Sequence, residues 1–223
     1  MDIAIPIFDR LTALDAVGPY EMLSRIPGAI VHFVAEEPGP KRAASGMLAL
    51  VADRALADLP EPEVIVVPGG PGTRALLDDE ALVGWIRRAH VASAWTTSVC
   101  TGALLLGAAG VLQDIEATTH WAELDALQSY GATPVERRVV ERGKVITAAG
   151  VSAGIDMALT LTERLASREV AMAIQLVTEY DPQPPFDAGS LAKAPEEVVE
   201  LLRAGLEAPQ PRSARSEVRL MPD

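Results

Sequence analysis

Ser93-Ala-Trp-Thr-Thr-Ser-Val-Cys-Thr-Gly-Ala-Leu-Leu-Leu-Gly-Ala-Ala109 is the stretch that decides the fold of this chain. Its first part, up to Val99, is apolar and rich in β-branched residues, which is typical of a buried strand. From Thr101 onward, leucine and alanine dominate, which favours a helix. Strands that pass directly into helices in this way are typical of α/β proteins that present a nucleophile at the edge of a sheet. The stretch therefore predicts an α/β fold with Cys100 at the turn.

Cys100 is the only cysteine of the chain, and its position allows two interpretations. A thiol at the start of a helix faces free backbone N–H groups and the positive end of the helix dipole, which favour a thiolate and hence a nucleophile. A free cysteine is also a small apolar side chain that is often simply buried. Position alone leaves both interpretations open.

Alternating strands and helices surround this stretch. Strands are predicted at 3–8, 30–35, 46–51, 64–68 and 93–99, a hairpin over 135–149, and helices at 15–25, 80–89, 101–109, 118–130, 152–166, 167–180 and 195–206. Pro6 suggests an edge position or an irregular exit for the first strand. The alternation predicts a flavodoxin-like α/β sandwich: a mainly parallel sheet, helices on both faces, and a cysteine nucleophile elbow.

Three predicted strands carry residues of interest at or just after their carboxyl ends, which share one edge in a parallel sheet. Asp15 follows the first strand, Gly69-Gly70 follow 64–68, and Cys100-Thr101 follow 93–99. The Gly70 and Thr101 amides could together stabilise a developing anion. Asp15 fits a helix N-cap, and it could also donate a hydrogen bond to the sulfur or activate water. A glycine pair taken alone is equally an ordinary loop break.

The three histidines give a weaker indication of function than Cys100 does. His120 could act as a base for Cys100, although a lone histidine is more often structural, and His32 and His90 carry only that structural interpretation. Their wide separation predicts no metal site.

The composition argues against several classes of binding partner. The net charge of −12 argues against nucleic-acid binding, because a phosphate backbone would be repelled. The longest apolar segment, Val99 to Leu112, is too short to cross a bilayer, so no membrane interaction is expected. A single cysteine and an N-terminus without signal-peptide features predict a cytoplasmic protein.

A chain of 223 residues without an internal linker predicts one domain over 1–206. Residues 207–223 are rich in Pro, Arg and Ser and predict a flexible tail.

Five ordered motifs between Ile3 and Tyr180 resemble the isonitrile hydratase branch of the PfpI-like, class I glutamine amidotransferase-like superfamily. The motifs are Leu14-Asp-Ala-Val-Gly-Pro-Tyr-Glu21, Val67-Pro-Gly-Gly-Pro-Gly72, Ser98-Val-Cys-Thr-Gly102, Ala117-Thr-Thr-His-Trp121 and Gly150-Val-Ser-Ala-Gly-Ile-Asp-Met157. Protease-like relatives carry His directly after the cysteine, where this chain has Thr101, which argues against proteolysis. Regulator relatives append a helix-turn-helix domain, and the short segment after Tyr180 leads us to expect none.

The resemblance implies hydration of an isonitrile to an N-substituted formamide without a cofactor, and a homodimer as in many relatives. Cys100 would add to the isonitrile carbon as a thioimidate, Asp15 would handle water, and the Thr101 hydroxyl would orient substrate or water. His120 is a weaker substrate-binding candidate. Two alternatives stay open: a redox or stress sensor that oxidises Cys100, and a carbonyl-metabolite hydratase or deglycase.

Overall fold

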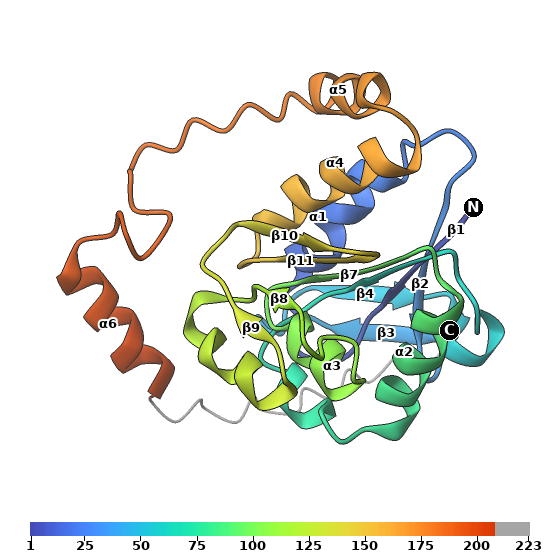
Figure 1. Ribbon diagram of the computed structural model, residues 1–223, viewed down its shortest axis with the longest axis horizontal. Coiled ribbons are helices and arrows are strands. Elements are labelled where there is room, and N and C mark those ends of the chain that lie inside the picture. Colours follow the sequence, from blue (N-terminus) through green and yellow to red (C-terminus); the bar gives the residue numbers. More distant parts are fainter. Residues whose placement is uncertain (208–223) are drawn as a thin grey trace, which may run out of the picture. The chain divides into compact units, whose positions relative to one another are not determined.

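The computed structural model describes the backbone of residues 1–207 and the side chains of residues 1–204. Its centre is a seven-stranded sheet in the order β10-β11-β7-β6-β1-β2-β5 (Figure 1). The strands are β1 Asp2–Pro6, β2 Ile30–Ala35, β5 Arg54–Ala55, β6 Val64–Val67, β7 Trp95–Val99, β10 Val139–Arg142 and β11 Val145–Ala148. All neighbours run parallel except β10 and β11. The predicted mainly parallel α/β fold is confirmed.

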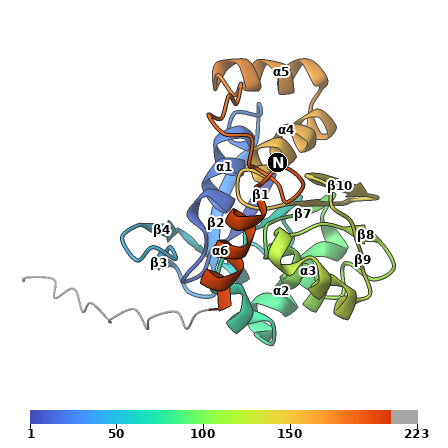
Figure 2. The same cartoon turned by 90° about the vertical axis from the view of Figure 1, so that its left-hand side faces the viewer.

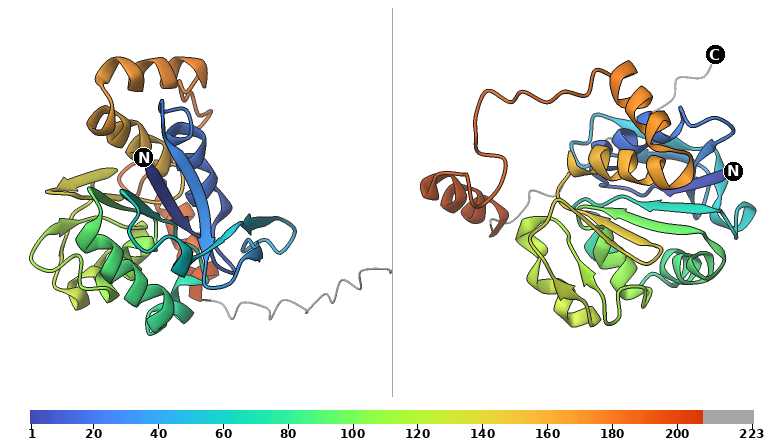
Figure 3. Two further views of the ribbon diagram at one scale, coloured as in Figure 1. Left: turned by 90° about the vertical axis from the view of Figure 1, so that its right-hand side faces the viewer. Right: turned by 45° about the horizontal axis from the view of Figure 1, so that its top comes forward.

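Helices cover both faces of this sheet. The helices up to residue 182 are α1 Ala13–Leu23, α2 Glu80–Ala92, α3 Gly102–Ala108, α4 Ala153–Leu165 and α5 Arg168–Val177, and a further helix, α6 Glu196–Glu207, follows later in the chain. α1 and α4 pack against each other on one face, α2 and α3 cover the opposite face, and α5 packs on α4 (Figures 1 and 3). β6 is buried along its whole length because helices cover it on both sides, which explains its unbroken apolar sequence.

Short elements complete the fold. Two small sheets pair β3 Gly39–Arg42 with β4 Ala49–Ala52, and β8 Glu116–Ala117 with β9 Thr133–Pro134. The β3–β4 hairpin projects from the side of the main sheet (Figure 2). Within the described residues, 3₁₀ segments lie at 56–58, 73–76, 121–123 and 125–130.

Some local predictions were wrong. The helix predicted over 118–130 is two 3₁₀ segments, and the first begins only at Trp121. Pro6 does not mark an edge strand, since β1 lies between β6 and β2. β6 pairs with β1 only at Ile3 and Ala4, so the missing N–H of Pro6 lies beyond that ladder. Ser152 stands at the N-cap of α4, but its side chain makes no capping bond there.

The chain divides into two compact units. Met1–Pro182 contains the sheet and all the buried hydrophobic residues of the core cluster, while the second unit begins at Gln183 and contains α6. The single domain over 1–206 stays a prediction, and the tail predicted for 207–223 lies outside the described residues from position 208 on. Among the described residues, no helix is both long and apolar enough to cross a membrane.

Candidate active site

Cys100 lies in the turn between β7 and α3, as predicted. Its φ of 56° is left-handed, a conformation that costs a non-glycine residue about 1–3 kcal/mol. The surrounding bonds hold it there: the Cys100 amide reaches the carbonyls of Ala148 and Ala149, and the Thr119 hydroxyl donates to the Cys100 carbonyl at 2.7 Å. The turn is thus fixed from β11 and from the segment after β8, and the thiol is almost completely buried.

Asp15 lies in the first turn of α1 and is completely buried. Its Oδ2 accepts a hydrogen bond from the Gly69 amide at 3.0 Å, and its Oδ1 has no hydrogen-bond partner within the side chains that the structure describes. The predicted N-cap role was wrong. Thr12, whose amide is held by the Gly69 carbonyl, occupies the N-cap position. The helix therefore begins at Ala13, which turns Asp15 inward.

The Asp15 carboxyl and the Cys100 thiol form an electrostatically coupled pair. Burial raises the pKa of Asp15 to about 7, and the Gly69 amide and the nearby thiol offset only part of this rise. Burial, with the negative charge of Asp15, raises the pKa of Cys100 to about 12. The Thr101 amide lowers the Cys100 pKa, in the direction predicted for a helix start, but burial and Asp15 outweigh it. The thiol therefore keeps its proton, while Asp15 changes between its acid and carboxylate forms near pH 7.

Val151 was missed as a site residue in the sequence. Its amide lowers the pKa of the Cys100 thiol, which it can do only from close to the sulfur. Val151 lies two residues before the start of α4 and has a φ of 41°, which is unusual for a β-branched residue. The motif Gly150-Val-Ser-Ala-Gly154 was the available signal, but a positive φ at valine is not readable from a sequence.

The amides of Gly69 and Gly70 donate hydrogen bonds to two of the predicted catalytic side chains. Gly69 binds Asp15, whereas the Gly70 amide donates to the Thr101 Oγ1 at 2.8 Å. A Cβ on Gly69 would lie 2.5 Å from the Thr101 nitrogen, and one on Gly70 would lie 2.4 Å from the Thr12 nitrogen. Both positions therefore require glycine. The Gly70 amide already donates to the Thr101 hydroxyl in this structure. The predicted oxyanion role of Gly70 would therefore require the amide to leave Thr101 and donate to the substrate, and it stays a prediction.

His120 lies near the site without bonding to it. Its Nδ1 accepts from the Ala122 amide at 3.3 Å, and its ring packs so closely on Gly150 that a Cβ there would lie 2.9 Å from Cδ2. Burial lowers the His120 pKa, so the ring is neutral at pH 7. No hydrogen bond joins His120 to Cys100 within the described part of the chain, and its substrate-binding role stays a prediction.

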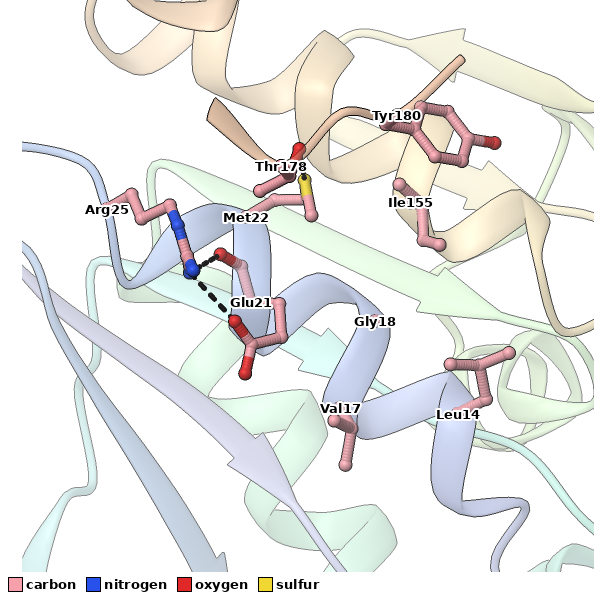
Figure 4. A pocket seen from close by; sticks show the side chains of 9 residues that line it. All are labelled: Leu14, Val17, Gly18, Glu21, Met22, Arg25, Ile155, Thr178 and Tyr180. Carbon is pink, nitrogen blue, oxygen red and sulfur yellow. Dashed lines mark hydrogen bonds and ion pairs between the residues drawn. The ribbon is translucent and has the colours of Figure 1, made fainter. Parts of the chain in front are cut away.

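A shallow pocket of about 360 Å³ lies between α1, α4 and the end of α5 (Figure 4). It is lined by Leu14, Val17, Gly18, Glu21, Met22, Arg25, Ile155, Thr178 and Tyr180. The Arg25–Glu21 ion pair, at 2.8 Å, lies on one side of it. Neither Cys100 nor Asp15 lines this pocket, although Asp15 directly follows the lining residue Leu14 in the chain. Within residues 1–207, no group of three His, Cys, Asp or Glu side chains is placed to hold a metal ion.

A parallel α/β sheet that presents a buried cysteine at a strand-to-helix turn, beside a buried carboxyl group, defines a class of cysteine-dependent α/β proteins. The chain belongs to the DJ-1/PfpI family, whose model matches residues 1–164.

Individual relatives agree with this assignment. The chain is 43% identical over 203 residues to the isonitrile hydratase of Pseudomonas putida, which covers 91% of this chain and 89% of the relative. It is 31% identical over 175 residues to the HTH-type transcriptional regulator CdhR of Pseudomonas aeruginosa, covering 76% of this chain and 51% of the regulator. A crystal structure of a ThiJ/PfpI family protein from Pseudomonas syringae superposes with a TM-score of 0.89 at 37% identity, covering 92% of this chain and 85% of that one.

Proposed function

We propose that this protein hydrates isonitriles to N-substituted formamides. The observation that carries the proposal is the Cys100–Asp15 pair: a buried thiol, with its proton on sulfur, beside a buried carboxyl group whose pKa is near neutrality. The similarity to the isonitrile hydratase of Pseudomonas putida over most of both chains supports the choice of substrate class.

In the first step Asp15 accepts the thiol proton, and the sulfur forms a bond to the terminal carbon of R–N≡C. The protonated Asp15 then returns the proton to that carbon, which gives the thioimidate R–N=CH–S–Cys100 and restores the carboxylate. Atoms and charge balance, since the thiol S–H has added across the isonitrile carbon. The first step forms an S–C and a C–H bond, breaks the S–H bond, and needs no oxidant or reductant.

In the second step Asp15 takes a proton from water while the oxygen adds to the thioimidate carbon, and the nitrogen receives that proton. The tetrahedral adduct R–NH–CH(OH)–S–Cys100 then breaks its C–S bond. The hydroxyl proton returns to sulfur through Asp15, and R–NH–CHO leaves. An Asp15 pKa near 7 suits both directions of proton transfer, because neither the acid nor the base form is strongly favoured at neutral pH.

The redox-sensor alternative has less support. Oxidation would use the same Cys100 thiol, and the chain has no second cysteine that could resolve a sulfenic acid. A deglycase or carbonyl-metabolite hydratase would use the same thiol, and substrate competition separates it from the proposed activity.

The test supplies cyclohexyl isocyanide, methylglyoxal and a peptide to the purified protein and follows formamide, hydration product and cleavage. Cys100→Ala should abolish formamide formation, because no thioimidate can form. Ser98→Ala is the matched control, since Ser98 is equally buried two residues away and its hydroxyl lacks a partner among the described side chains. It should keep full activity. Formamide formation that survives in Cys100→Ala would contradict the covalent mechanism.

We further propose that the protein acts as a homodimer in the cytoplasm. The support for the dimer is a set of large apolar side chains left exposed on α5, namely Met172, Leu176 and Val177. Light scattering on the purified full chain tests the dimer, and a monomeric mass would contradict it.

A further inference from the structure

We propose that Thr73, which the mechanism above does not use, is a positioning residue that directs the Thr101 hydroxyl proton toward the substrate at Cys100. The proposal rests on the proposed function for its substrate. Thr73 begins the 3₁₀ segment Thr73–Leu76, is completely buried, and lies in the loop after β6.

The first step of the argument is the direction of one hydrogen bond. The Thr73 Oγ1 lies 3.0 Å from the Thr101 Oγ1, and this is its only hydrogen-bond partner among the described side chains and backbone. If Thr101 donated to Thr73, the Thr73 proton would be buried without an acceptor, at a cost of about 1–3 kcal/mol. Thr73 therefore donates and Thr101 accepts.

The second step concerns what remains of the Thr101 hydroxyl. Its oxygen already accepts from the Gly70 amide at 2.8 Å, and with Thr73 both of its acceptor positions are filled. Thr101 can then act only as a donor. The acceptor within reach is the Gly70 carbonyl at 3.3 Å, which is long for an O–H···O bond and already accepts from the Thr73 amide at 3.0 Å.

The third step places that proton in the site. Thr101 follows Cys100 directly in the turn between β7 and α3, and its amide lowers the pKa of the thiol. The Thr101 hydroxyl also lies against Gly69, the residue whose amide holds Asp15, because a Cβ on Gly69 would lie 2.6 Å from Oγ1. A weakly held donor in this position gains a better acceptor when negative charge develops on the carbon or nitrogen of the substrate as sulfur adds. Thr73 acts through Thr101 and does not itself touch the substrate.

The experiment compares steady-state formamide formation in five variants of the full chain: three single variants described here, then Thr101→Val with and without Thr73→Val. Thr73→Val should lower kcat about tenfold with KM changed less than about twofold, because the lost hydrogen bond acts in the transition state. Thr73→Ser, which keeps the hydroxyl, should restore kcat to within about twofold of wild type. Thr97→Val is the matched control: Thr97 is also completely buried, and its hydroxyl donates to the Ile65 carbonyl, away from Thr101. It should leave kcat unchanged.

The double variant decides whether Thr73 acts through Thr101. In the Thr101→Val background, Thr73→Val should cause no further loss of kcat, since the hydroxyl it directs is already gone. An unchanged kcat in Thr73→Val, equal losses in Thr73→Val and Thr97→Val, or a full additional loss in the double variant would each overturn the proposal.

A readout without substrate separates this inference from the proposed function. Thr73→Val should speed hydrogen exchange of the Gly70 amide, measured by NMR on glycine-labelled protein, by about tenfold over Thr97→Val, because the Thr101 oxygen is released to rotate. If wild type hydrates no isonitrile but this exchange difference is found, the proposed function fails and the Thr73–Thr101 link stands. If isonitriles are hydrated and the exchange rates are equal, the inference about Thr73 fails alone.

Discussion

At the scale of single residues, the chemistry depends on where one proton resides. A buried carboxyl group and a buried thiol cannot both ionise cheaply, and the Gly69 and Val151 amides favour one negative charge on the pair. A cysteine at a helix start is usually expected to be a ready thiolate. Here the geometry favours a thiol that is deprotonated only when Asp15 accepts its proton.

Asp15→Asn should stabilise the protein more at pH 8 than at pH 5. A carboxyl group whose pKa rises from 3.8 to about 7 on folding stabilises the native state below its unfolded pKa, and this contribution is lost as pH rises through 7. Between pH 5 and pH 8 the wild type should lose about 2–3 kcal/mol relative to the variant. Urea unfolding at both pH values measures the difference. The control is Asp53→Asn at an exposed carboxylate, and an equal gain at both pH values for Asp15→Asn would contradict the raised pKa.

At the scale of elements, the site depends on the close approach of α3 to the end of β6. A Cβ on Gly102 would lie 2.1 Å from the Val67 carbonyl oxygen, so a larger residue cannot start the helix at this position. This contact brings the amides that follow β6 against Thr101 and so couples the glycine loop to the nucleophile turn.

Gly102→Ala should therefore destabilise the protein by about 2–3 kcal/mol, because backbone must move to admit the methyl group. For a chain of this size that is a drop of roughly 5–10 °C in Tm, measured by calorimetry. Gly189→Ala is the control, since a Cβ at Gly189 meets no atom within 4 Å and should leave Tm nearly unchanged. A Gly102→Ala protein as stable as this control would show that α3 can shift freely.

At the scale of the whole molecule, the parallel sheet brings residues 15, 69, 73 and 100 together from segments far apart in the chain. The order β11-β7-β6-β1 places the nucleophile turn, the glycine loop and the start of α1 at one edge of the sheet. The core that holds this arrangement extends from Ile3 to Ile174, within the first compact unit.

A protein that ends at Pro182 should therefore fold and melt cooperatively, with its Tm close to that of the full chain. The physical reason is that the buried hydrophobic residues of the core all precede position 183. Circular dichroism melting of the shortened and full chains makes the comparison, with formamide formation as a second measurement. Loss of the cooperative transition on shortening would show that the core needs residues beyond 182.

Local patterns predicted most of the strands and helices, and the reasons are physical. β6 and the β7–α3 junction were predicted well because a strand buried on both faces is uniformly apolar and a leucine-rich run favours a helix. The first turn of α1 and the 118–130 segment were not, because tertiary bonds decide where these segments begin. The Thr12 amide donates to the Gly69 carbonyl, so α1 begins at Ala13, two residues before the predicted start. His120 accepts a hydrogen bond from the Ala122 amide and so caps a 3₁₀ turn instead of opening an α-helix.

The sequence by itself determined the fold class, the place of Cys100 in a strand-to-helix turn and the motifs that meet at one edge of the sheet, because these follow from local periodicity and from the topology of parallel strands. Only the tertiary structure decided the ionisation of Asp15 and Cys100, the capture of the Gly70 amide by Thr101, and the contacts of Val151 and Thr73. Burial and hydrogen-bond direction arise between segments that are distant in the chain, and no local pattern encodes them.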